Sequence, residues 1–198
     1  KSKRKPFFLW KLYFSEVFQR ENPGFDVVIA NPPYVGEKGN KEIFRPIANS
    51  EFGRKFYHGK IDLFYFFFHK SIDISRERAS VSFITTNYYP TAYGARNLRM
   101  DLKNRTTIRE IVNFNELRIF ETALGQHNMI TIFIKDLIKD YRTKVTSVNS
   151  SGTATNETLV KILNKKDNGF TFSLLSKDSL FEGDENYIIH RLSDKLLD

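Results

Sequence analysis

The chain has 198 residues, of which 40% are hydrophobic, so it is long enough to bury the core of one full domain. It carries 31 Lys and Arg against 23 Asp and Glu, and the resulting net charge of +8 favours a polyanionic partner. Cysteine is absent, which excludes a thiol nucleophile, a cysteine-based zinc site and a disulfide framework.

The sequence also predicts a cytoplasmic protein without a membrane partner. No apolar stretch approaches the roughly 20 residues of a membrane-spanning helix, and no signal-peptide pattern precedes the fold.

The first predicted elements lie within residues 7–30. Residues 7–18 alternate aromatic and polar side chains, which predicts a strand or an irregular segment leading to a turn at Asn22-Pro23-Gly24. The short, β-branched run at residues 25–30 predicts a strand buried on both faces of a parallel sheet.

This strand ends at Asn31-Pro32-Pro33-Tyr34. Two consecutive prolines donate no backbone N–H and fix φ, so the chain must leave the sheet in a stiff, extended turn. Ligand sites in parallel α/β sheets lie just beyond the carboxyl ends of strands. The amide oxygen of Asn31 and the carbonyl of Pro32 are neutral acceptors for an exocyclic NH2 group, and the ring of Tyr34 can stack on the heterocycle that carries it.

The tetrapeptide after a hydrophobic strand resembles motif IV of the S-adenosylmethionine-dependent amino methyltransferases, above all the DNA adenine-N6 enzymes. The resemblance implies Asn31, Pro32, Pro33 and Tyr34 as the catalytic residues, with Pro33 holding Tyr34 in place. It also implies S-adenosyl-L-methionine as the cofactor and double-stranded DNA as the partner. It extends over residues 14–135, and Glu16-Val17-Phe18 matches a stretch that often precedes motif IV in the family.

The next two segments differ sharply in character. Residues 35–60 are polar and rich in glycine without a sustained period, so we interpret them as a loop that is either a lid over the substrate pocket or a disordered insertion. The apolar residues of 61–78 would cover nearly the whole circumference of a helix, which predicts deep burial. The start of this segment resembles motif V, which implies Phe67 as the ring beside the cofactor's adenine, although core packing explains each of its rings equally well.

A strand is predicted at residues 79–86, followed by a turn that resembles motif VI. Residues 92–105 predict an amphipathic helix whose arginines either face solvent or meet phosphate. Two further strands are predicted at residues 108–114 and 129–134, and they resemble the hairpin that ends the family's sheet.

The loop of this hairpin resembles motif VIII and implies Phe120 as a ring that contacts the flipped base. His127 in the same loop is either a ligand for phosphate or base, or an ordinary surface residue.

The predicted fold class is α/β, namely the C-terminal half of a Rossmann-like methyltransferase sheet with a terminal β-hairpin. Residues 1–135 are predicted to be a partial methyltransferase catalytic domain with motifs IV to VIII. Residues 136–198 are predicted to be a linker and the start of a target-recognition region, with a Ser, Thr, Gly and Asn cluster at 147–158. Within that region the patterns predict helices at 157–164 and 188–197 and a strand at 169–175.

The resemblance implies methyl transfer from S-adenosyl-L-methionine to the N6 amino group of a flipped adenine in DNA, as in type IIG restriction-modification enzymes. No metal is implied. The cofactor-binding motif I, an Asp-x-Phe-x-Gly-x-Gly-like turn, is missing from these residues. We therefore expect the protein to extend upstream of Lys1, with fused or associated nuclease and recognition regions, and the 198 residues to be inactive alone. The alternatives are methylation of RNA bases or protein glutamine, or a non-catalytic nucleic-acid-binding module.

Overall fold

The computed structural model describes residues 8–120, 126–164, 169–182 and 188–189. Its helical segments are α1 (Trp10–Tyr13), α2 (Ser15–Phe18), α3 (Lys41–Ala48), α4 (Glu51–Phe56), α5 (Leu63–Ile74), the 3-10 turn η1 (Tyr93–Ala95), α6 (Arg96–Arg105), α7 (Asn156–Asn164) and α8 (Lys177–Leu180). Its strands are β1 (Phe25–Ala30), β2 (Ser75–Thr86), β3 (Thr107–Asn113), β4 (Leu117–Arg118), β5 (Asn128–Ile134), β6 (Arg142–Val148), β7 (Gly152–Thr153), β8 (Phe170–Ser176), β9 (Phe181–Glu182) and β10 (Ile188–Ile189).

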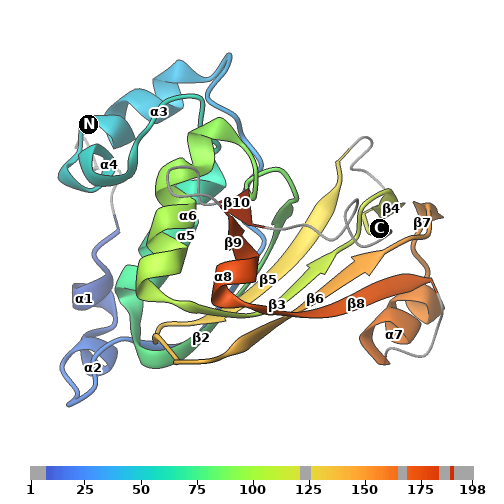
Figure 1. The fold of residues 1–198 in the computed structure, drawn as a ribbon. Helices are drawn as coiled ribbons and strands as arrows, with labels where there is room; N and C mark the ends of the chain where they lie inside the picture. Colours follow the sequence, from blue (N-terminus) through green and yellow to red (C-terminus); the bar gives the residue numbers. More distant parts are fainter. Residues whose placement is uncertain (1–7, 121–125, 165–168, 183–187, 190–198) are drawn as a thin grey trace.

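Six strands form one mixed sheet in the order β1-β2-β5-β3-β6-β8 (Figure 1). β1 and β2 are parallel, whereas β5 lies between β2 and β3 and is antiparallel to both. The α/β class, the four predicted strands and the hairpin of β3 with β5 are therefore confirmed. The sheet continues beyond the hairpin, because β6 pairs in parallel with β3 and β8 pairs with β6.

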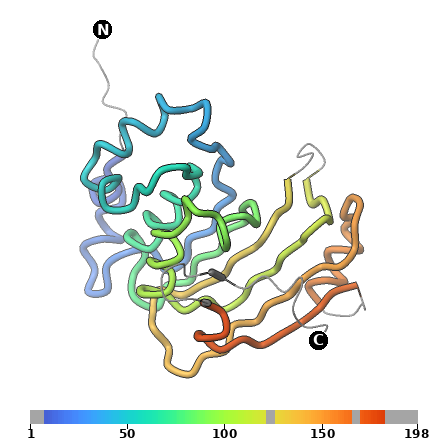
Figure 2. The backbone as a smooth tube through the Cα atoms, turned by 45° about the horizontal axis from the view of Figure 1, so that its top comes forward, coloured from blue at the N-terminus to red at the C-terminus, as the bar shows by residue number. Residues whose placement is uncertain are grey.

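β1 forms an edge of this sheet, and Figure 2 shows that α1 to α4 lie on its side of the molecule, away from β6 and β8. The prediction that β1 is buried on both faces was wrong for this chain. Val27 and Ile29 are 57% and 77% exposed. Their apolar side chains look like those of an internal strand, which is why the pattern predicted burial.

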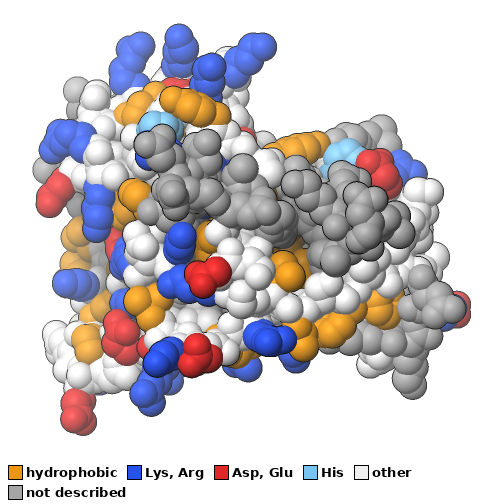
Figure 3. Space-filling view, in the orientation of Figure 1, with side chains coloured by type: hydrophobic (Ala, Val, Ile, Leu, Met, Phe, Trp, Pro, Cys, Tyr) orange, Lys and Arg blue, Asp and Glu red, His pale blue; other side chains and the backbone are white. Residues whose placement is uncertain are grey.

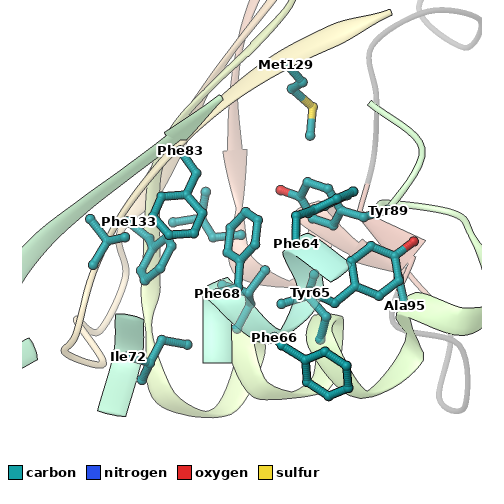
Figure 4. Packing of buried hydrophobic residues seen from close by; sticks show 14 of the residues in the cluster. Phe64, Tyr65, Phe66, Phe68, Ile72, Phe83, Tyr89, Ala95, Met129 and Phe133 are labelled. Carbon is teal, nitrogen blue, oxygen red and sulfur yellow. The ribbon is translucent and has the colours of Figure 1, made fainter. Parts of the chain in front are cut away.

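α5 supplies the centre of the core, as its all-round apolar pattern predicted. Phe68 is completely buried, with its ring centroid 4.7 Å from that of Phe83 on β2 and 6.0 Å from that of Phe133 on β5 (Figure 4). Phe64, one turn earlier, meets Tyr89 edge-on. Burying one large aromatic side chain contributes about 2 to 3 kcal/mol, so α5 fixes β2 and β5 beneath it.

α5 ends at Ile74, four residues earlier than predicted, because β2 begins at Ser75. The register of β1 on β2 shifts between Phe25 and Val27, and Arg78 takes a positive φ of 63° in the resulting bulge. Gly24 enters β1 with φ of 118°, and a Cβ there would lie 2.4 Å from the backbone nitrogen of Arg76. Only glycine fits this close approach.

Two predicted irregular segments are helical. Residues 7–18 contain the short helices α1 and α2, and residues 35–60 contain α3 and α4. Phe44 of α3 is 1% exposed and belongs to the main core, so this part of the expected lid is packed against the domain. The hydroxyl of Ser50 caps α4 by accepting from the backbone N–H of Gly53 at 2.9 Å.

The sheet crosses the predicted domain boundary at residue 135. Val145 and Val148 of β6 are completely buried, and Val148 forms a second cluster with Phe114, Leu117 and Ile162. The helix expected near 157–164 and the strand near 169–175 are present as α7 and β8, whereas the helix expected at 188–197 lies almost wholly outside the described residues. Among the helices of the described part, none is long and apolar enough to cross a membrane.

α5 and α6 are joined by a buried polar pair. His69 of α5 is 1% exposed and stacks on Phe56, and its Nδ1 lies 2.7 Å from a carboxylate oxygen of Asp101 on α6. Burial lowers the pKa of His69 even though Asp101 opposes that shift. Neutral His69 therefore donates its Nδ1–H to Asp101, which also accepts from Arg105 at 3.2 Å.

We expect the folded state to lose stability as the pH falls through the ordinary histidine pKa of 6.5. The pKa of His69 is lower in the folded than in the unfolded chain, so below pH 6.5 the unfolded chain binds the extra proton. Urea unfolding at pH 7.5 and 5.5 measures the loss. His69→Phe, which keeps a ring against Phe56, should show a smaller loss than the wild type; an equal loss in both would contradict this origin.

Candidate active site at the carboxyl end of β1

The turn at residues 31–34 leaves the carboxyl end of β1, where a ligand site was predicted. Asn31 and Pro33 are exposed, Pro32 is buried and Tyr34 is half-buried. The backbone N–H of Leu63 donates to the carbonyl of Val35 at 2.8 Å, so the start of α5 holds the end of the turn. The Asn31 side chain is thus presented to solvent from a backbone fixed on both sides.

The Tyr34 hydroxyl lies at the centre of a small polar group. It donates to Oδ1 of Asn31 at 2.7 Å and lies 3.2 Å from the carbonyl oxygen of Ile84 on β2. Nδ2 of Asn128 lies 3.4 Å from the same hydroxyl. Burial raises the pKa of Tyr34, so the hydroxyl keeps its proton and remains a donor. The ring itself packs edge-on against Phe64 at 6.2 Å.

Side-chain amides gather where the neighbouring strands end. Asn87 follows β2, Asn113 ends β3 and Asn128 begins β5, and all three are at most 5% exposed. Nδ2 of Asn87 donates to Oδ1 of Asn113 at 2.9 Å. Within the described residues, Nδ2 of Asn113 and Oδ1 of Asn128 have no hydrogen-bond partner. Sequence reasoning did not find this cluster, although its signal is present: an asparagine at the same end of each strand.

Phe67 lies on the wall of an apolar groove of about 700 Å³ beside β1. Its ring is 41% exposed, whereas Phe64, Phe66 and Phe68 are buried. Trp10 and Ile29 line the same groove, as do the side chains of Lys70 and Phe66. Phe67 is therefore the exposed ring of α5, whereas Phe64, Phe66 and Phe68 are buried. The spacing of these residues in the sequence did not distinguish them.

Phe120 is half-buried and follows β4, which pairs in parallel with β7. The residues that connect it to Gln126 lie outside the described part of the chain. His127 lies closer to the amide cluster, with Nδ1 2.8 Å from the backbone carbonyl of Asn115. Asn115 in turn donates to Ser147 Oγ and the Val148 carbonyl, both at 2.8 Å.

Two arginines of α6 have structural partners. Arg99 is 2% exposed and donates to the backbone carbonyls of Tyr89 and Ala92 at 2.7 and 2.6 Å. Arg105 pairs with Asp73 of α5 at 2.7 Å. These contacts hold α6 in place. The sequence predicted that the arginines of this helix either face solvent or meet phosphate, whereas Arg99 and Arg105 bind groups of the protein itself.

Strand order and the turn after β1 define the chain as part of a methyltransferase fold. The structure of a modification subunit of a putative type I restriction enzyme from Vibrio vulnificus YJ016 has a TM-score of 0.60 at 13% identity, covering 84% of this chain and 36% of that one. A type I restriction-modification methyltransferase subunit from Streptococcus thermophilus has a TM-score of 0.58 at 17% identity, covering 86% and 38%.

The family described as Eco57I restriction-modification methylase matches residues 1–120. The chain belongs to this family. It is similar to the type II methyltransferase M.HincII of Haemophilus influenzae, with 29% identity over 114 residues, which is 57% of this chain. The match spans 22% of the length of that relative.

Among the described residues, no strand pairs with the outer edge of β1, which leads us to expect self-association of the 198-residue chain. An apolar strand with an unpaired edge offers backbone groups to a second copy. Ile29→Lys places a charge on this edge and should lower the self-association constant in sedimentation equilibrium. Leu163→Lys on α7 is the matched control, because Leu163 is 69% exposed and α7 lies beside β8, at the opposite edge of the sheet from β1 (Figure 1). Equal effects of the two variants would contradict pairing through β1.

Proposed function

We propose that the chain is part of an enzyme that transfers a methyl group from S-adenosyl-L-methionine to the N6 amino group of adenine in DNA, within a restriction-modification protein. The observation that carries the proposal is the exposed Asn31 amide on a rigid turn at the carboxyl end of β1. Membership of the restriction-modification methylase family supports the same conclusion. We also propose that recognition and nuclease regions accompany it, and that residues 136–198 begin the target-recognition part.

Methyl transfer to an amino group of this kind needs hydrogen-bond acceptors more than it needs a general base. The lone pair of adenine N6 is delocalised into the ring, so the enzyme must favour the sp3-like nitrogen that forms during methyl transfer. Oδ1 of Asn31 and the carbonyl of Pro32 accept the two amino hydrogens and localise the lone pair on N6. An amide oxygen has two lone pairs, so Asn31 can accept from the substrate while it accepts from Tyr34. The proton leaves only after the new N–C bond has formed.

A target adenine must leave the duplex to reach Asn31. Extrusion costs a few kcal/mol, and stacking on an aromatic ring returns about 1 to 3 kcal/mol per base. Tyr34 offers such a ring, which packs edge-on against Phe64, and we propose that Pro33 holds it in place. We propose Phe120 as a second ring that contacts the same base and the α3–α4 segment as a cover over it.

The residues present fit one part of the cofactor. The exposed ring of Phe67 in an apolar wall suits the adenine of S-adenosyl-L-methionine, and Asn31 lies at the end of the strand that borders this groove. When bound, the cofactor supplies an electrophilic methyl group. The chain's own residues hold its adenine and keep water from the apolar wall.

The charge of the α3–α4 end suits a DNA partner. Lys and Arg side chains gather there in Figure 3, and five of the exposed ones are Lys38, Lys41, Arg45, Arg54 and Lys55. Clustered positive charge supplies most of the non-specific affinity for a phosphate backbone. An Asn31-type acceptor pair would equally accept an NH2 group of RNA or of glutamine, and family membership favours DNA over both.

Asn31→Ala in the full-length protein should lower methyl transfer by at least ~100-fold, because it removes an acceptor that acts on the transition state. Asn31 is exposed, so the fold should survive. Incorporation of labelled methyl groups into unmethylated DNA measures the rate, and melting temperature reports the fold. Asn49→Ala, another exposed asparagine, is the control. Wild-type turnover by Asn31→Ala would sink the assignment.

The 198 residues alone should bind S-adenosyl-L-methionine weakly or not at all. Four of the six strands of their sheet are those expected for a partial methyltransferase sheet, and Phe67 and the end of β1 would reach only an edge of the cofactor. Calorimetric titration of the 198-residue chain tests this. Micromolar binding would show that a complete cofactor site exists within these residues.

A further inference from the structure

We propose that Asn128 is a positioning residue for the methyl transfer: through the Tyr34 hydroxyl it keeps Oδ1 of Asn31, and not Nδ2, turned towards the substrate amino group. This inference rests on the proposed function. It concerns a residue at the start of β5 that lies 94 positions from Tyr34 in the sequence. The need for it arises from the symmetry of an amide, because a half-turn of the Asn31 side chain would present a donor to another donor.

The hydroxyl of Tyr34 has one hydrogen and several neighbours. Oδ1 of Asn31 and the carbonyl of Ile84 both lie within reach, at 2.7 and 3.2 Å, and only one of them can receive the hydrogen at a time. Nδ2 of Asn128 approaches the same oxygen as a donor at 3.4 Å. When Asn128 donates to one lone pair of the Tyr34 oxygen, that oxygen is less able to accept a hydrogen bond from Asn31. The Tyr34 hydroxyl therefore donates its own hydrogen to Oδ1 of Asn31.

The distances agree with this direction. The 2.7 Å between Tyr34 Oη and Asn31 is that of an O–H···O bond, shorter than the ~2.9 to 3.0 Å usual for N–H···O. The amide oxygen of Asn31 is therefore the atom next to Tyr34. Its second lone pair remains available for the incoming amino group.

The burial of Asn128 supports a role beyond packing. It is 1% exposed, its Nδ2 makes only long contacts of 3.4 and 3.5 Å, and its Oδ1 has no partner among the described residues. An apolar residue there would avoid the cost of burying an unpaired acceptor. Its position is well fixed, since Asn128 pairs with Thr86 in the sheet and its carbonyl accepts from the Phe114 N–H at 3.0 Å.

The test is a double-mutant cycle in the full-length protein with Tyr34→Phe and Asn128→Leu. Phenylalanine keeps the stacking face and removes the hydroxyl, and leucine keeps the branched shape of the asparagine side chain, at a larger volume, without a donor. Each single variant should lower kcat by about tenfold with the KM for unmethylated genomic DNA unchanged, since one orienting hydrogen bond is lost. The double variant should be no slower than Tyr34→Phe, because Asn128 acts only through the hydroxyl.

Thr143→Val is the matched control, because Thr143 on β6 is 3% exposed and its hydroxyl donates to the backbone carbonyl of Ile108, outside the candidate site. It should lower the melting temperature yet leave kcat within about twofold of the wild type. Multiplicative losses in the double variant, or a normal kcat for Tyr34→Phe, would overturn the inference. Where Asn128→Leu fails to fold, Asn128→Ala takes its place in the cycle, because alanine also removes the donor and adds no volume. A wild-type enzyme that leaves no N6-methyladenine would instead reject the proposed function.

Discussion

The parallel pairing of β1 with β2 is the constraint on which the rest of the structure depends. Parallel neighbours cannot be joined by a tight turn, so the chain that leaves the end of β1 must return along the sheet before β2 begins. Residues 31–74 make this return, and they contain the Asn31 turn, α3, α4 and α5. The candidate site, its proposed cover and the main core helix are thus parts of one crossover connection. A change in that pairing would displace all of them together.

The same topology explains why the polar groups of the site come from distant parts of the sequence. The carboxyl ends of β1, β2 and β3 and the start of β5 lie at the same end of the sheet. This brings four asparagines into one region, namely Asn31, Asn87, Asn113 and Asn128. Asn87, Asn113 and Asn128 are buried there, and neutral amides tolerate burial far better than carboxylates because no net charge is desolvated. A reaction that needs acceptors and no strong base is suited to such surroundings.

The sequence predicted the four strands and the turn at Asn31 because their signals are local: β-branched runs and two adjacent prolines. It missed the helicity of residues 7–18 and 35–60, where turns as short as Trp10–Tyr13 carry too few residues for a period. The contact of Asn128 could not be predicted from the sequence, for a different reason. Its partner Tyr34 is set by the placement of β5 next to β2, and no local pattern encodes that neighbour. The exposure of Phe67 likewise depends on the groove around it.

The position of β5 governs how the chain must fold. It is the last of the first four sheet strands to be synthesised, yet it lies between β2 and β3 and pairs with both. Until residue 134 is available, β2 and β3 have no common neighbour, and both expose backbone groups and apolar faces. Closure of the sheet is therefore a late, non-local event, and such events are slow and favour aggregation. A ribosome-bound nascent chain that ends before β5 would be a natural client for a chaperone.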